Sequence, residues 1–212
     1  MIYLFDELQT FTETVRHEAY RLLPEQRLEK IGNYRFERDR DLGMITYLLL
    51  RYALREEYAI DEAVTFVCGP HGKPYLKEYP EIHFNFSHCR EGALCAVSSS
   101  PVGVDIQEIE TSYEKVMRRS MSGPEIRVIS ESPMPDTAFT TFWVLKECYI
   151  KYRGTGLSEE LRTLDFSQAV GNRRFRDCFC YHDHTPRYCY SYCSGTSGAP
   201  KVRRLSAGQL LL

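Results

Sequence analysis

The segment from residue 139 to residue 156 constrains the fold of this chain more than any other. Its apolar residues recur at steps of three or four, which is the period of a helix with one buried face: Phe139, Phe142, Trp143, Leu145, Tyr149 and Ile150. Pro135 and Asp136 stand before the segment, and Gly154 and Gly156 follow its last apolar residue, as at the start and stop of a helix. The sequence therefore predicts one helix of about five turns.

This helix would carry a pair of opposite charges along one edge. Glu147 and Lys151 are four residues apart, and Trp143 lies one turn before Glu147 on the same edge. Such a pair is most often a solvated ion pair that contributes a few tenths, roughly 0.2–0.5 kcal/mol. Taken alone, this helix favours a solvated ion pair over a functional site.

The stretch from Pro101 to Gln107 alternates strictly between apolar and other residues. Val102, Val104 and Ile106 would lie on one face of a strand, and Gly103, Asp105 and Gln107 on the other. The sequence predicts a half-buried strand from which Asp105 projects on the polar side.

Together, two segments carry a family resemblance. Gly-Val-Asp-Ile at residues 103–106, and further on Trp-Val-Leu-Lys-Glu-Cys-Tyr-Ile-Lys at residues 143–151, resemble the signature motifs of the 4'-phosphopantetheinyl transferases. The resemblance is to the larger, monomeric type that serves peptide synthetases and fatty acid synthases. A Phe-Asn-Phe-Ser-His segment at residues 84–88 precedes both motifs, as in that family. The likeness spans roughly Pro24 to Leu157.

The resemblance implies an α+β fold of two similar, pseudo-duplicated halves packed side by side, with the active site between them. We expect residues 1–100 to form an N-terminal half that contacts the phosphates of coenzyme A. Residues 101–212 would form a C-terminal half with the metal and catalytic residues. The implied reaction transfers the 4'-phosphopantetheine arm of coenzyme A to a serine of an apo acyl or peptidyl carrier protein, and releases adenosine 3',5'-bisphosphate.

The resemblance also implies a magnesium site and catalytic groups. Cleavage of a pyrophosphate develops charge that a hard cation can neutralise, and such a cation takes oxygen ligands. Asp105 and Glu147 are the implied carboxylates, and Glu147, or a water on the metal, would accept the proton of the carrier serine. Lys151 would supply positive charge to the pyrophosphate. Many members of the family carry an acidic residue where this chain has Gln107, so we expect its amide oxygen to serve as the third metal ligand, directly or through water.

Coenzyme A contacts are implied at Arg40, Lys73, Ser87 and His88, together with Asp105 and Lys151. Arg40 is the best match to the arginine of the family, and Arg38 stands close behind it. Lys73 belongs to a Gly-Lys-Pro segment, although a lysine in such a loop is more often solvated. A Ser87-His88 hydrolase site is disfavoured, because neighbouring strand residues point to opposite sides and no Gly-x-Ser-x-Gly elbow surrounds the serine.

Composition excludes some classes of function. A formal net charge of -2 gives no reason to expect nucleic acid as a partner, since duplex binding needs concentrated positive charge. The run of arginines and lysines from residue 27 to residue 40 is interleaved with acidic residues and is typical of a solvated helix face. No leader or membrane-spanning pattern is visible, so we expect a cytoplasmic protein without membrane contact. The resemblance implies that it is a monomer.

The eight cysteines raise the question of disulfides or metal. Cys68, Cys89, Cys95 and Cys148 lie within apolar patterns and are expected to be small buried hydrophobes in a reducing compartment. Further along, Cys178, Cys180, His182 and His184 would share one strand face, with Cys189 and Cys193 following. Four residues spread along one strand cannot all reach one ion, and Cys-x2-Cys pairs are missing, so the pattern favours plain strands over a soft-metal site.

Other elements follow from the same periodicities. We predict strands at residues 2–5, 64–68, 82–88, 92–98, 175–181 and 187–193, and helical stretches at residues 8–23, 41–58 and 113–121. Residues 123–135 are predicted to be a loop, Leu157, Leu164 and Phe166 to belong to extended structure, and Gly171-Asn172 to form a turn.

Two alternatives to the transferase remain open from the sequence. One is a coenzyme A-binding protein that has lost transfer, which the complete set of Asp105, Glu147 and Lys151 argues against. The other is a magnesium-dependent pyrophosphohydrolase of coenzyme A or a nucleotide, in which water would replace the carrier serine.

Overall fold

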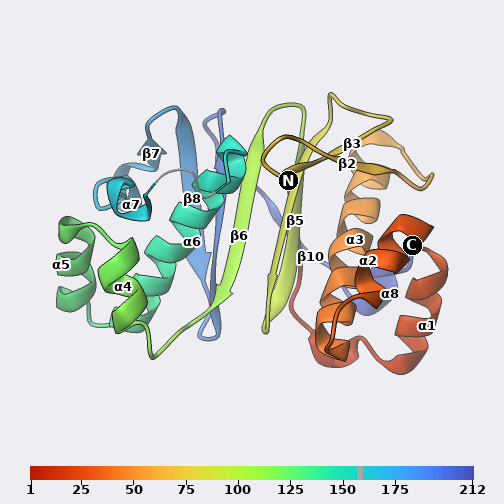
Figure 1. The fold of residues 1–212 in the computed structure, drawn as a ribbon, viewed down its shortest axis with the longest axis horizontal. Helices are drawn as coiled ribbons and strands as arrows, with labels where there is room; N and C mark the ends of the chain where they lie inside the picture. The colour runs from red at the N-terminus through yellow and green to blue at the C-terminus, as the bar shows by residue number, and fades with distance from the viewer. Residues whose placement is uncertain (157–159) are drawn as a thin grey trace.

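The computed structural model describes residues 1–156 and 160–212 and arranges them as an α+β fold around two four-stranded sheets (Figure 1). The strands are β1 (Ile2–Phe5), β2 (Phe66–Cys68), β3 (Pro74–Leu76), β4 (His83–Cys89), β5 (Gly92–Ser98), β6 (Val102–Glu108), β7 (Arg174–Phe175), β8 (Cys178–His184), β9 (Tyr188–Ser194) and β10 (Val202–Arg204). The helices are α1 (Glu13–Arg21), α2 (Glu25–Gly32), α3 (Glu37–Tyr58), α4 (Glu114–Ser120), α5 (Gly123–Glu131), α6 (Pro135–Arg153), α7 (Ala169–Asn172) and α8 (Ala207–Leu210). The expected α+β class is confirmed.

The two sheets have different strand orders. The first runs β10-β1-β5-β4, and the second runs β6-β9-β8-β7. Neighbouring strands are antiparallel except for β1 and β10, which pair in parallel with Ile2 opposite Val202. The strand β10 therefore brings the chain back to the first sheet after the second one is complete. The division at residue 100 does not include this return, and it stays a prediction.

Each sheet is covered by one long helix, and the remaining faces of the two sheets meet. The helix α3 packs on the first sheet, and α6 packs on the second (Figure 1). Between the sheets lies a third apolar cluster, to which both contribute: Ile2, Leu4, Leu94 and Ala96 from the first, and Val102, Val104, Ile106, Tyr188, Tyr190 and Tyr192 from the second. The alternation predicted for residues 101–107 is confirmed, since its three apolar residues enter this cluster.

The central helix is also confirmed. The helix α6 spans 19 residues, begins at Pro135 and stops where Gly154 adopts φ 64° as its C-cap. Glycine suits this left-handed position because it has no Cβ. Most of this helix is buried, and Glu147 and Lys151 lie on its half-buried edge.

Several local predictions were wrong. Residues 123–131 form the helix α5, whose start is fixed by a capping box between Ser122 and Glu125. The prolines and serines of this segment suggested a loop, but Pro124 lies in the first turn, where its missing N–H costs nothing. The strand expected at residues 175–181 is instead the hairpin of β7 and β8, with Arg176 at φ 50° in the turn.

Three further expectations differ from the structure. Gly171-Asn172, which was expected to form a turn, ends the short helix α7, and Arg173 adopts φ 58° just after it. Leu157 lies outside the described residues, and Leu164 and Phe166 follow the 3-10 turn Leu161–Thr163 without belonging to any strand. Cys68 is exposed, whereas the other seven cysteines are buried, and all eight are free.

The charged run at residues 27–40 is only partly a solvated surface. Arg27 is 4% exposed, and its guanidinium donates to the carbonyl oxygen of Gly43 and to Oγ1 of Thr46, at 2.7 and 2.9 Å. It also stacks over the ring of Phe86, with 5.5 Å between Cζ and the ring centre. Because these partners satisfy the charge, Arg27 joins α2 to α3 instead of facing water.

Within residues 1–156 and 160–212, no helix has both the length and the hydrophobicity that crossing a bilayer requires.

Candidate active site

The candidate site lies where the edge strands of the two sheets meet. The strand β4 is the last of the first sheet, β6 is the first of the second, and the two lie in contact. No ladder joins them. Instead, Oδ1 of Asn85 accepts the backbone N–H of Val104 at 2.9 Å, and the Ser87 hydroxyl reaches Asp105. Side chains therefore join the two halves at this point.

A glycine allows the helix α6 to lie directly on β6. A Cβ at Gly103 would overlap the carbonyl oxygen of Cys148 and would lie 2.5 Å from the backbone nitrogen of Tyr152. Only a residue without a side chain permits so close an approach between strand and helix. Asp105, two residues on, shares the face of Gly103 and comes beneath the polar edge of α6.

Two side chains, from β4 and α6, converge on one oxygen atom of Asp105 on β6. The Lys151 ammonium donates to Oδ1 of Asp105 at 2.6 Å and to Oγ of Ser87 at 2.9 Å. The Ser87 hydroxyl donates to the same Oδ1 at 2.7 Å. Since Ser87 and Asp105 are 8% and 5% exposed, water screens this cluster little. The structure thus brings together three of the residues that the sequence named.

Glu147 lies half-buried on α6, one turn before Lys151. Burial raises the pKa of its carboxyl group, the negative charge of Asp105 raises it further, and Lys151 opposes both. No described residue donates a hydrogen bond to Glu147 or to Oδ2 of Asp105. Two neighbouring carboxylates with unused oxygens are therefore present at the site.

This donor set suits magnesium. A hard divalent cation binds carboxylate oxygens, and its positive charge would relieve the repulsion that raises the pKa of Glu147. Asp105 and Glu147 are the residues that would hold such an ion.

Gln107 lies on the same strand face, farther along β6. It lines a pocket of about 290 Å³ together with Glu110, Tyr113, Phe139 and Trp143. The rings of Phe139 and Trp143 stack in this pocket with 6.3 Å between their centres. Trp143 is thus both packing and pocket wall, and metal ligation by Gln107 stays a prediction.

Lys73 is not a solvated loop lysine. Its ammonium donates to the carbonyl oxygens of Val102, Lys151 and Tyr152 at 3.0, 2.6 and 3.2 Å. Burial lowers its pKa to about 8. Two of these carbonyls belong to the last turn of α6, where a cation is favoured by the helix dipole. The aliphatic part of Lys73 also passes close to Gly154. A Cβ added at Gly154 would lie 2.9 Å from Cδ of Lys73.

Lys73 also borders a second pocket, of about 270 Å³. His71, Asn85, Phe86, Lys151 and Gly156 are among its other lining residues. Residues of both halves thus line the pocket, and one of them is Lys151, whose ammonium group belongs to the candidate site. Coenzyme A contact by Lys73 stays a prediction.

His88 and Arg38 lie near the end of β4, whereas Arg40 does not. Desolvation lowers the pKa of His88, and the charge of Lys151 lowers it further. Arg38 donates to the carbonyl oxygen of Arg90 at 2.5 Å, in the turn that follows β4. Arg40 instead donates to the carbonyl oxygen of Tyr34 at 2.9 Å and lines a different pocket, so its described contacts do not join it to Asp105.

Two family models match the chain, one for each half. A model described as 4'-phosphopantetheinyl transferase, N-terminal, matches residues 12–102, and one described as 4'-phosphopantetheinyl transferase superfamily matches residues 101–204. The chain belongs to the 4'-phosphopantetheinyl transferase superfamily.

Curated relatives agree with this assignment. A 4'-phosphopantetheinyl transferase of Bacillus subtilis is 32% identical over 137 residues, covering 63% of this chain and 61% of the relative. An L-aminoadipate-semialdehyde dehydrogenase-phosphopantetheinyl transferase of Xenopus laevis is 30% identical over 160 residues, and its human counterpart 29% over 167 residues. These two matches cover 68% and 70% of this chain and 53% of each relative. The chain thus spans less than two thirds of the length of the curated relatives it matches.

In this member of the superfamily, sequence reasoning missed a buried ion pair beneath the site. Lys146 is fully buried, and its Nζ lies 2.8 Å from Oε2 of Glu125 on α5. It also donates to the carbonyl oxygens of Leu161 and Leu164 at 2.7 and 2.5 Å, while Oε1 of Glu125 accepts the N–H of Phe166. Lys146, which belongs to the second superfamily motif, therefore holds α5 and the segment that contains Leu161 and Leu164 against α6. The spacing of Ser122 and Glu125 could have revealed the helix, but nothing local reveals the pair.

Proposed function

We propose that the protein transfers the 4'-phosphopantetheine arm of coenzyme A to a serine of an apo acyl or peptidyl carrier protein, with magnesium and with release of adenosine 3',5'-bisphosphate. The observation that carries the proposal is that Ser87 and Lys151 both donate to one oxygen of Asp105, beside the carboxylate of Glu147, which has no ion-pair partner among the described residues. Superfamily membership supplies the reaction class.

Each residue has a role that its chemistry allows. Lys151 and Ser87 present donors to the pyrophosphate, and His88 adds an imidazole donor at the end of β4. Asp105 and Glu147 hold the metal, which supplies positive charge to the pyrophosphate oxygens when it is bound. Glu147, whose pKa is raised, accepts the proton of the attacking serine.

The carrier protein docks, in this proposal, beside the pocket at Gln107. Val116 on α4 is 43% exposed and borders that pocket together with Tyr113 and Trp143. An apolar side chain next to an aromatic pocket suits the apolar surface of a partner helix. We further propose that the protein acts as a cytoplasmic monomer, which its eight free cysteines suit.

The test incubates the protein with coenzyme A, magnesium and a panel of apo acyl and peptidyl carrier proteins, and weighs each carrier. At least one carrier should gain the mass of one phosphopantetheine arm at its serine. Lys151→Ala should slow the gain by roughly tenfold to a thousandfold, as expected for the loss of one electrostatic stabiliser. Lys201→Ala, which removes an exposed lysine far along the chain, should leave the rate unchanged.

Two outcomes would contradict the proposal. Tight binding of coenzyme A without mass gain by any carrier would identify a binding protein. Hydrolysis of coenzyme A in the absence of a carrier, at the rate seen in its presence, would identify a pyrophosphohydrolase.

A further inference from the structure

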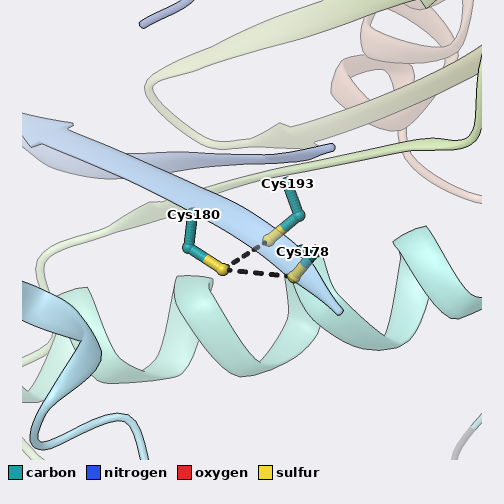
Figure 2. A group of neighbouring side chains, drawn as sticks. All are labelled: Cys178, Cys180 and Cys193. Atoms are coloured by element: carbon teal, nitrogen blue, oxygen red, sulfur yellow. Dashed lines mark hydrogen bonds between the residues drawn. The ribbon is translucent and has the colours of Figure 1, made fainter. Parts of the chain in front are cut away.

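Three cysteines converge in the core beneath α6. Cys178 and Cys180 belong to β8, Cys193 belongs to β9, and their side chains point toward one another (Figure 2). The sulfur of Cys180 lies 3.5 Å from that of Cys178 and 3.4 Å from that of Cys193. All three sulfurs lie within 4.8 Å of one another, and no residue of the three is more than 1% exposed.

The convergence comes from strand register. Residues two apart on a strand share a face, and Cys180 is paired directly with Cys193 across the sheet. The N–H of Cys180 points away from β9, to the carbonyl oxygen of Arg173, so the pair is of the closely spaced, non-hydrogen-bonded kind. The sequence pattern placed His182 and His184 with these cysteines. They continue along β8, however, and do not belong to the cluster of described residues.

The sulfur separations suit a single ion. Zinc binds thiolates at about 2.3 Å, and tetrahedral geometry then places the sulfurs about 3.8 Å apart. The observed separations of 3.4 and 3.5 Å are close to this value. Side-chain rotations that move the sulfur atoms by roughly a few tenths of an ångström would admit an ion.

Hydrogen bonds link the three thiols. Cys193 donates to the sulfur of Cys180, and Cys180 and Cys178 share a second hydrogen bond. The three sulfur atoms therefore form one connected group.

We propose that Cys178, Cys180 and Cys193 bind a soft d10 cation, either Zn²⁺ or Cu⁺, in the core of the second half. As each metal–sulfur bond forms, a thiol that is still protonated releases its proton to solvent. Cys148 on α6 interacts with Cys193 but lies outside the group of three sulfurs that are all within 4.8 Å of one another. If the ion is zinc, which requires four ligands, the side chain of Cys148 would have to move toward the group to provide the fourth thiolate. Three thiolates suffice for Cu⁺. With zinc, the ion would tie the helix that carries Glu147 and Lys151 to two strands of its sheet.

Because the cluster is buried, the full chain is loaded during refolding. The reduced protein is unfolded and refolded with Co²⁺ as the probe for zinc, and separately with Cu⁺, and bound metal is counted by mass spectrometry after gel filtration. We expect one ion per chain, and for Co²⁺ an intense near-ultraviolet thiolate-to-metal absorption. This readout does not depend on transferase activity, so it can fail while the proposed function holds.

Cysteine variants test whether the cluster binds metal and distinguish zinc-type from Cu⁺ binding. Cys180→Ser should abolish binding, while Cys95→Ser, which changes a cysteine buried in the first sheet, should leave it intact. Cys148→Ser should abolish Co²⁺ binding and spare Cu⁺. Wild-type protein that refolds without retaining either ion would overturn the proposal, even if the serine variants fail to fold. Binding retained in Cys180→Ser, or a Cys180–Cys193 disulfide formed in preference to metal, would also overturn it.

Discussion

A single oxygen, Oδ1 of Asp105, already accepts two hydrogen bonds, from Lys151 and Ser87. Its partner Oδ2 accepts none from the described residues. The aspartate can therefore keep its contact with the first half while offering an oxygen to a metal. Glu147 accepts no hydrogen bond from the residues that the structure describes, so nothing among them offsets the desolvation of its carboxylate. A nearby cation would therefore stabilise the charged form of Glu147 more than that of Asp105.

The raised pKa of Glu147 predicts that its charge destabilises the metal-free fold. The folded pKa exceeds the ordinary value of 4.5, so the stability that the protonated carboxyl contributes is lost as pH rises through the folded pKa. Glu147→Gln should abolish transfer, yet in EDTA at neutral pH it should unfold at a temperature equal to or above that of the wild type. Calorimetry at several pH values should show the difference shrinking toward pH 4.5. A variant that is clearly less stable at neutral pH would show that Glu147 has a stabilising partner.

Gln107 allows a second prediction on the metal. Replacing its neutral amide by a carboxylate should strengthen the attraction for a divalent ion, by about 1 kcal/mol after desolvation and repulsion are subtracted. Gln107→Glu should therefore lower the magnesium concentration for half-maximal transfer several-fold and change the saturated rate little. A magnesium titration at saturating coenzyme A measures this. Superimposable curves for variant and wild type would place Gln107 outside the reach of the metal.

At the scale of elements, the site depends on how closely α6 lies on β6. Periodicity predicted both elements, because each buries one face along most of its length. The touching backbones at Gly103 could not be predicted, since a glycine in a strand has several explanations. The convergence of Cys178, Cys180 and Cys193 also escaped prediction, because the pairing of β8 with β9 sets it. Resemblance named Asp105 and Lys151, but their bond to Ser87 depends on the meeting of two strand edges.

Gly103→Ala tests the contact between strand and helix. The added methyl group would overlap backbone atoms of α6 that cannot rotate away, so we expect destabilisation by about 3 kcal/mol or more and a large loss of transfer. Gly32→Ala is the matched control, because a Cβ there meets nothing within 4 Å, and its stability should stay the same or rise. Denaturant unfolding measures both. Equal stability of the two variants would show that α6 can shift on β6 at little cost.

At the scale of the whole molecule, the halves are joined across β4 and β6 by few polar contacts. Asn85→Ala would leave the buried N–H of Val104 without its partner, at a cost of about 1–3 kcal/mol. We expect this variant also to weaken coenzyme A binding, because the pocket beside Lys73 is lined by both halves. Thr46→Val removes a buried hydrogen bond within the first half alone and should lower stability without changing that affinity. Calorimetric titration with coenzyme A compares the two, and equal affinities would remove Asn85 from the junction's function.

The return of the chain through β10 has a consequence for motion between the halves. The chain leaves the first sheet after β5 and rejoins it at β10, which pairs with β1. Two covalent connections, at residues 99–101 and 195–201, therefore cross between the sheets. Two bodies tethered at one point can swivel in any direction, but two tethers leave only rotation about the line through both. Any separation of β4 from β6 would follow that single axis.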